Sequence, residues 1–137
     1  MATLSGTIVD VFNISTPLGP KLTTAGLGIQ SCYITVTFTG TYVQGENAEV
    51  LAITTAISAK LHNGGKTIAL VPGSVGLAAP GDEAGTAIGA KTIAVSGTGI
   101  TCELTTGDLS TEHAGAALGA MGHGICFHVT YTYTPVS

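Results

Sequence analysis

The chain has 137 residues, of which only 9 % are charged, and its four basic and eight acidic residues give a net charge of −4. An average soluble domain is about one quarter charged, so the surface of this protein is poor in charge. Four basic residues neutralise few phosphates, which argues against nucleic acid as a partner. The hydrophobic fraction of 45 % is too high for a disordered chain and is sufficient for one β-rich domain spanning residues 1–137.

The sequence contains no run of about 18 apolar residues, so no membrane-spanning helix is predicted. Residues 1–6 lack the basic and apolar segments of a secretory signal, and the expected compartment is the cytoplasm in which the chain is made. The three cysteines, Cys32, Cys102 and Cys126, show no CxxC spacing. Their odd number favours reduced, buried thiols over a disulfide framework.

Alternation of apolar and polar residues predicts two strands in the first third of the chain, at Leu4–Asn13 and Ser31–Val43. One face of the second strand is apolar and consists of Cys32, Ile34, Val36 and Phe38. The opposite face carries Tyr33, Thr35, Thr37 and Thr39. The stretch Thr16–Gly28 between the strands is rich in glycine and proline and is expected to be a loop.

The segment Glu46–His62 has two interpretations. As a helix, it begins with acidic residues, carries Lys60 in its last turn, ends at Asn63-Gly64 and places one apolar stripe on Val50, Ile53, Ile57 and Leu61. As a strand, it continues into a hairpin whose turn is Asn63-Gly64. We favour a helix near 47–62, because its charges suit the helix dipole and because strands of this length are uncommon.

In the second half of the chain, shorter strands are expected at Thr67–Val71, Thr92–Ser96 and Ile100–Thr106. The stretch Pro72–Gly89 is expected to be a loop that exposes the acidic pair Asp82-Glu83 to solvent. Ser110–Met121 is expected to be a loop or a partly formed helix. A serine can cap a helix there, but the two glycines in the segment each cost a helix about 1 kcal/mol.

The strongest alternation predicts a long strand at the C-terminal end. Its apolar face consists of Ile125, Phe127, Val129, Tyr131 and Tyr133. Its polar face consists of Cys126, His128, Thr130, Thr132 and Thr134. Threonine is β-branched and pairs well across strands. Together these elements predict a mainly β, antiparallel sandwich or barrel-like domain with one helix near 47–62.

One set of residues has the side chains of zinc ligands: His113, His123, Cys126 and His128, with Cys102 as an outlying candidate. Because His123 is expected in a turn, away from the strand that holds Cys126 and His128, we expect no convergence and no metal. Ser96 lacks the strand-to-helix context of a nucleophile elbow, and residues 64–67 lack the first glycine of a phosphate loop. The sequence therefore predicts no catalytic, cofactor-binding or metal site, and no enzyme.

The scarcity of charge points in another direction. A free monomer normally spreads charge over its surface, and a nearly neutral surface favours association. Long strands rich in threonine and alanine, with few charges to protect them, favour edges and faces that are covered by other protein.

Several further features belong together: the absence of a signal, the richness in Gly, Ala and Thr, a strand that runs into Thr39–Gly45, and Asp108-Leu109-Ser110 ahead of a long final strand. In these features the chain resembles the capsid decoration, or cement, proteins of tailed bacteriophages. The resemblance implies a β-rich structural protein, often a homotrimer. It also implies binding to the major capsid protein on the outside of the virion, where the protein clamps neighbouring subunits against internal DNA pressure, after a period in the host cytoplasm during assembly.

Two alternatives stay open. Within the virion, the chain could be a tail or head-completion component. In a different class, it could be a small ligand-binding or metal-dependent β-barrel that uses the histidines and cysteines. A pocket with converging polar groups would favour the second alternative, whereas flat faces lined with threonine would favour the structural role.

Overall fold

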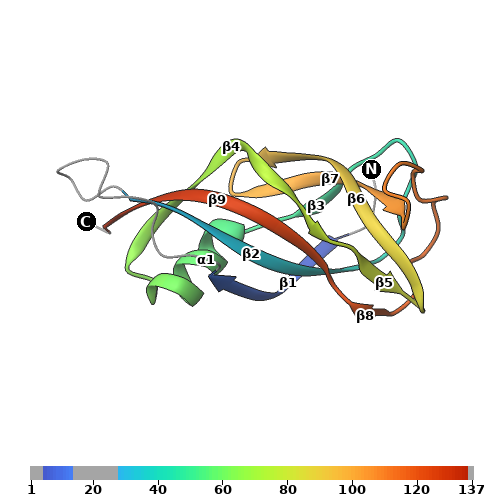
Figure 1. The fold of residues 1–137 in the computed structure, drawn as a ribbon, viewed down its shortest axis with the longest axis horizontal. Coiled ribbons are helices and arrows are strands. Elements are labelled where there is room, and N and C mark those ends of the chain that lie inside the picture. Colours follow the sequence, from blue (N-terminus) through green and yellow to red (C-terminus); the bar gives the residue numbers. More distant parts are fainter. Residues whose placement is uncertain (1–4, 14–27, 136–137) are drawn as a thin grey trace.

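Strands make up most of the computed structural model, which describes residues 5–13 and 28–135 (Figure 1). The strands are β1 (Ser5–Asn13), β2 (Gly28–Thr39), β3 (Ala48–Val50), β4 (Lys66–Ala79), β5 (Gly81–Glu83), β6 (Thr86–Ser96), β7 (Gly99–Thr106), β8 (Met121–His123) and β9 (Ile125–Pro135). One helix, α1 (Ile53–His62), interrupts them. The predicted fold class, mainly β with one helix, is confirmed.

All nine strands belong to one curled sheet with the order β4-β9-β2-β1-β3-β7-β6-β5-β8. Neighbours are antiparallel except β1 and β3, which run parallel. The sheet curls into a half-barrel in which β4 lies against β6 and β8 approaches β2. At this approach the backbone N–H of Phe38 lies 3.1 Å from the sulfur of Met121. Along the longest axis of the molecule, α1 lies toward one end and β5 and β8 toward the other (Figure 1).

The concave side of the sheet holds the hydrophobic core, and β9 shows how the sequence builds it. The side chains of Ile125, Phe127, Val129 and Tyr131 are fully buried, while those between them are half-buried on the opposite face. The strand and its two faces are therefore confirmed. Burial of one such large apolar side chain contributes about 1.5–3 kcal/mol, which makes this alternation a major source of stability.

Strand β2 has the predicted faces but different ends. It begins at Gly28, which was expected in the preceding loop, and it ends at Thr39 instead of Val43. The remainder of the expected loop, residues 16–27, lies outside the described residues. Gly40 has a φ of 113°, which turns the chain out of the strand, and the N–H of Tyr42 then donates to the carbonyl of Ala116 at 3.0 Å. This turn sends the Tyr42 side chain into the core.

The segment Glu46–His62 is divided between a strand and a helix. Ala48–Val50 forms β3 between β1 and β7, so the predicted acidic first turn is wrong. Ala52 adopts a left-handed conformation with a φ of 58°, and this turn separates β3 from α1. The helix itself is confirmed over Ile53–His62, including Lys60 in its last turn and its end at Asn63, which rules out the hairpin. It buries Ile53 and Ile57 against the sheet.

The expected loop Pro72–Gly89 is wrong. β4 continues to Ala79, and β5 and the start of β6 follow directly. The ladder between β4 and β9 shifts register between Leu70 and Val75, and the bulge of residues 71–74 holds a proline and a glycine, Gly73, with a φ of 80°. An edge strand tolerates proline because its outer N–H groups have no ladder partner.

The segment Ser110–Met121 contains no helix, so of the two expected states the loop is confirmed. Its backbone is pinned by isolated bridges from Glu112 to Thr105 and from Ala117 to Thr41. β8 begins at its last residue, Met121, and pairs with β5.

Candidate functional site

The residues with zinc-ligand side chains lie in separate places. His113 contacts Glu83, whereas His123 is 85 % exposed and lies 3.8 Å from Asp82. Cys126 and His128 lie on the polar face of β9, and Cys102 is fully buried in β7. Within the described ranges 5–13 and 28–135, no group of three or more His, Cys, Asp or Glu residues is placed to hold a metal ion. Burial raises the pKa of Cys102 to about 12, which keeps it a neutral thiol and a poor ligand.

The acidic pair Asp82-Glu83 was expected in an exposed loop, and this prediction is wrong. Both residues lie in β5, and the Glu83 side chain is only 19 % exposed. Its two oxygens accept hydrogen bonds from His113 Nε2 at 3.0 Å and from the N–H of Gly119 at 2.8 Å. Because His113 Nδ1 in turn accepts from the N–H of Gly115, Nε2 carries the proton that His113 donates to Glu83. This contact joins the loop of residues 107–120 to β5.

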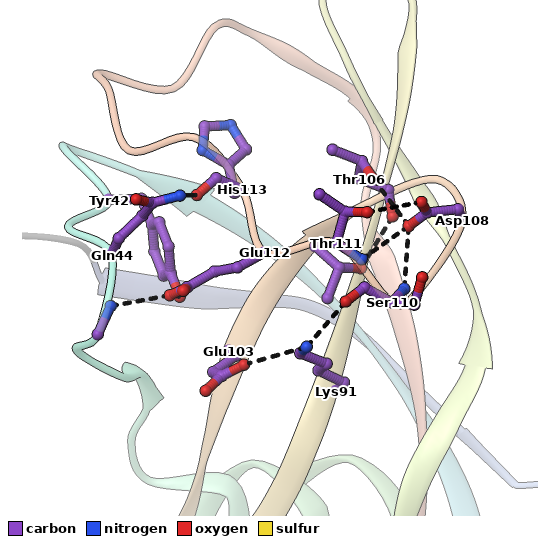
Figure 2. A network of polar contacts seen from close by, with 12 residues as sticks. Tyr42, Gln44, Lys91, Glu103, Thr106, Asp108, Ser110, Thr111, Glu112 and His113 are labelled. Carbon is purple, nitrogen blue, oxygen red and sulfur yellow. Dashed lines mark hydrogen bonds and ion pairs between the residues drawn. The ribbon is translucent and has the colours of Figure 1, made fainter.

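A second contact fastens the same loop to residues 42–45 (Figure 2). The Tyr42 hydroxyl donates to Glu112 Oε2 at 2.6 Å, and the N–H of Gly45 donates to the same oxygen at 2.9 Å. These bonds favour the ionised carboxylate and lower the pKa of Glu112. Burial and the bond to Glu112 raise the pKa of Tyr42, which therefore stays protonated and continues to donate.

Asp108 organises the turn at the start of this loop (Figure 2). Its carboxylate accepts from the N–H groups of Ser110 and Thr111, both at 2.9 Å, and from the hydroxyls of Thr111 and Thr106, both at 2.8 Å. These four donors hold the pKa of Asp108 far below its usual range. Nearby, Lys91 Nζ donates to the carbonyl of Ser110 at 2.9 Å. Such a turn is a structural device, since every donor comes from its own few residues or the adjoining strand.

We call this region the charged end: the loop of residues 107–120 together with Asp82, Glu83, Lys91 and Glu103. It contains five of the eight acidic residues of the chain, namely Asp82, Glu83, Glu103, Asp108 and Glu112. Four of these five accept hydrogen bonds from nearby groups of the chain, and Glu103 pairs with Lys91 at 3.7 Å. A general acid or base needs a carboxylate directed at a substrate, and these carboxylates are directed at the protein instead.

The remaining candidates from the sequence are also structural. Ser96 ends β6 at the turn into β7, and residues 64–67 join α1 to β4. Beside this connection lies an open groove of about 380 Å³, lined by Thr54, Thr55, Ser58, Ala59, Gly64, Lys66, Thr67 and Ile68. The Ser58 hydroxyl already donates to the carbonyl of Lys66 at 2.7 Å. The groove therefore lacks the buried, converging polar groups of a small-molecule site.

A different surface is formed by the convex side of β1, β2 and β9, which we call the threonine face. Its β2 and β9 side chains are Tyr33, Thr35, Thr37, Cys126, His128, Thr130 and Thr132. Neither β2 nor β9 contains an Asp, Glu, Lys or Arg, and β1 contributes only Asp10 at the rim. Where the face is polar it uses hydroxyl groups, as in the 3.0 Å hydrogen bond between Ser31 and Thr130.

A row of aromatic rings crosses the threonine face. Phe12 of β1 is paired with Tyr33 of β2, and Tyr33 is paired with His128 of β9. The ring centroids lie 5.4 Å apart for Phe12 and Tyr33 and 5.9 Å apart for Tyr33 and His128. Next in the row is Gly76 of β4, the partner of His128. We call these four residues the aromatic row; the sequence placed Tyr33 and His128 on polar faces but contained no sign that they would be neighbours.

Comparison with family models, curated proteins and solved structures finds no match to this chain. Within the described ranges, no helix has the length and apolar character needed to cross a bilayer. The proposal that follows therefore rests on the surfaces of the chain itself.

Proposed function

We propose that this chain is a structural virion protein, a decoration protein that binds the major capsid protein on the outside of a bacteriophage capsid and strengthens the shell. The observation that carries the proposal is the threonine face. Its two longest paired strands carry no formal charge, although one face of this pair points away from the core. A surface without charge favours burial against other protein, either another copy or the capsid.

Hydroxyl groups suit this role for a physical reason. Exposed ion pairs contribute little to association, and salt screens them further. Threonine hydroxyls form hydrogen bonds without the desolvation cost of a charge, and the cores of protein interfaces are depleted in charged residues. A contact of this composition keeps its strength when ionic conditions change, which is useful to a shell that leaves the host cytoplasm.

The charged end supports a role without catalysis. Its carboxylates hold the loop of residues 107–120 in place, and the groove beside α1 lacks converging polar groups. These residues stabilise the fold rather than a reacting group. The alternative of a metal-dependent β-barrel loses its motivation, since the histidines that suggested it, His113 and His123, are each bound to a carboxylate of β5.

The test is reconstitution on capsids of the parent particle that lack the chain. The purified protein should bind at a fixed copy number, equally at 0.05 M and 1 M NaCl, and decorated capsids should retain DNA at temperatures at which bare capsids leak. Cryo-electron microscopy should place it on the outer shell. Density only at the tail or neck would favour a tail or head-completion component, and absence from the particle would refute the proposal.

A charge placed on the threonine face provides the matched variant. Thr35→Lys introduces an ammonium group into the face and should prevent incorporation into capsids. Thr98→Lys adds the same charge at the exposed turn between β6 and β7 and should bind like the unmodified chain. Equal incorporation of both variants would show that the threonine face is not buried in the particle.

A further inference from the structure

The two ends of the aromatic row differ in shape. At one end the Phe12 side chain is 40 % exposed and stands above the strands. At the other end Gly76 has no side chain, and a Cβ atom at this position would meet no atom within 4 Å. The row therefore runs from a projecting ring, through Tyr33 and His128, to a vacant position beside His128.

We propose that the aromatic row is the centre of a contact with a second copy of this chain, related to the first by a two-fold axis. The axis lies in the interface, parallel to the strands and between β2 and β9. Rotation about it reverses the order of the row, so that Phe12 of each copy lies over Gly76 of the other and Tyr33 lies over His128. An isologous contact requires this kind of self-complementary surface.

The distribution of charge selects a second copy as the occupant. The chain carries a net charge of −4, and most of its acidic residues lie in the charged end. Two copies that met through the charged end would bring like charges together, which opposes association. The threonine face avoids this repulsion, since its charged residue in the described strands, Asp10, lies at the rim on β1.

The size of the face is sufficient for a specific contact. The β2–β9 ladder extends from Gly28 to Val36 on β2, about 27 Å at about 3.4 Å per residue. The four strands β1, β2, β9 and β4 cover about 19 Å at about 4.8 Å per strand, so the flat area is about 500 Å². Corrugation by side chains raises the accessible area toward the roughly 800 Å² that each partner buries in a standard interface.

This inference builds on the proposed function, because it assigns the partner of the same face, but its test needs no capsid. Sedimentation equilibrium of the purified chain from about 1 to 100 µM should show a dimer that is equally stable at 0.05 M and 1 M NaCl. The resemblance to decoration proteins implies a trimer, so the mass of the oligomer discriminates between the two. A monomer at 100 µM, or a trimer, would overturn the two-fold contact.

Variants locate the contact. Tyr33→Thr keeps a residue that suits a strand and removes the central ring, and it should weaken dimerisation at least about tenfold, the usual effect of losing an aromatic anchor. Gly76→Val fills the vacant position and should weaken dimerisation as well. Val43→Ala is the control, because Val43 has a similar exposure of 39 % but lies outside the face, and it should leave the dimer unchanged.

Circular dichroism and the thermal midpoint of each variant distinguish a lost contact from a lost fold. Folded Tyr33→Thr and Gly76→Val proteins that still dimerise like the unmodified chain would overturn the inference. The capsid experiment gives separate information. A dimer that does not bind capsids refutes the decoration role and leaves the dimer intact, whereas a monomer that does bind them refutes the dimer alone.

Discussion

The threonine face and the charged end satisfy polar groups in opposite ways. On the threonine face, hydroxyls lie on strands whose backbone groups are already paired in ladders, and no carboxylate is needed to hold the chain. In the charged end, the loop of residues 107–120 has few ladder bonds, and Glu83, Asp108 and Glu112 accept hydrogen bonds from its N–H groups or from residues that border it. Charge appears in this molecule where the backbone lacks a sheet partner.

This difference separates residues that hold the fold from residues that face outward. The few carboxylates of the charged end are used to order a loop, whereas the ladders of β2 and β9 leave their convex side chains free of any structural duty beyond β-sheet formation. A surface with that freedom can be specialised for contact with other protein. Substitutions can test each side of the comparison.

The largest effect is expected beneath the threonine face. Phe127 points into the core from β9 and is fully buried, so Phe127→Ala should lower the free energy of unfolding by about 3–5 kcal/mol. Thr130→Ala on the convex side of the same strand removes the bond to Ser31 and should cost less than about 1 kcal/mol. Urea denaturation of both variants measures the contrast. Equal, small losses would mean that the two sides of β9 have been assigned wrongly.

An intermediate effect is expected in the charged end. Glu83→Gln replaces a carboxylate that binds both His113 and Gly119, and one of its two acceptor oxygens becomes a donor. The loss should be about 1–3 kcal/mol, because a half-buried partner is left without its bond. Glu49→Gln, at an exposed position of β3, should stay within about 0.5 kcal/mol of the unmodified chain. Indistinguishable thermal midpoints for these two variants would show that the loop is not held by Glu83.

Acid should weaken the charged end through Asp108. Its pKa in the folded chain lies below the ordinary value of about 3.9, so its stabilisation is complete above about pH 4 and is lost as the pH falls through the folded value. Thermal midpoints between pH 7 and pH 2 should therefore decline below about pH 4. Asp108→Asn should have a lower midpoint at pH 7 and a shallower decline. An unchanged slope in this variant would assign the acid response to other carboxylates.

The smallest effect is expected at the opposite end of the molecule, where His62 closes α1. Its ring nitrogen lies 2.9 Å from the Tyr131 hydroxyl, and burial, with a contribution from Lys66, lowers the pKa of His62. The unfolded chain then binds a proton at about pH 6.5 that the folded chain resists, so stability is complete above about pH 6.5 and declines below it. His62→Gln should remove this shallow decline between pH 6.5 and pH 5. A decline of the same size in the variant would assign it to another histidine.

Local patterns predicted much of the fold. The faces of β2 and β9 follow from strict alternation, and the end of α1 follows from Asn63-Gly64, which adopts the left-handed conformation that terminates a helix. Boundaries that depend on tertiary contacts were not predictable. β3 is a strand because β1 and β7 pair with it on both sides, although its residues also suit a helix.

The arrangement of side chains was less predictable than the fold. Contact between Glu83 and His113 depends on the pairing of β5 with β6 and β8, and no local pattern reports the partner of a three-residue strand. The aromatic row depends in the same way on the register of three ladders, from Phe12 to Gly76. The sequence shows which residues face outward, and only the register shows which of them meet.

The bulge in β4 has a consequence for aggregation. β4 is an edge strand of 14 residues with almost no charge, and a straight edge of this kind would offer its free N–H and C=O groups to the next molecule and seed a fibril. Pro72 removes one of those N–H groups, the kink at Gly73 breaks the edge into two short pieces, and Lys66 places a cation at its beginning. A chain without much charge thereby remains soluble at high concentration, and open-ended growth through strand edges is blocked.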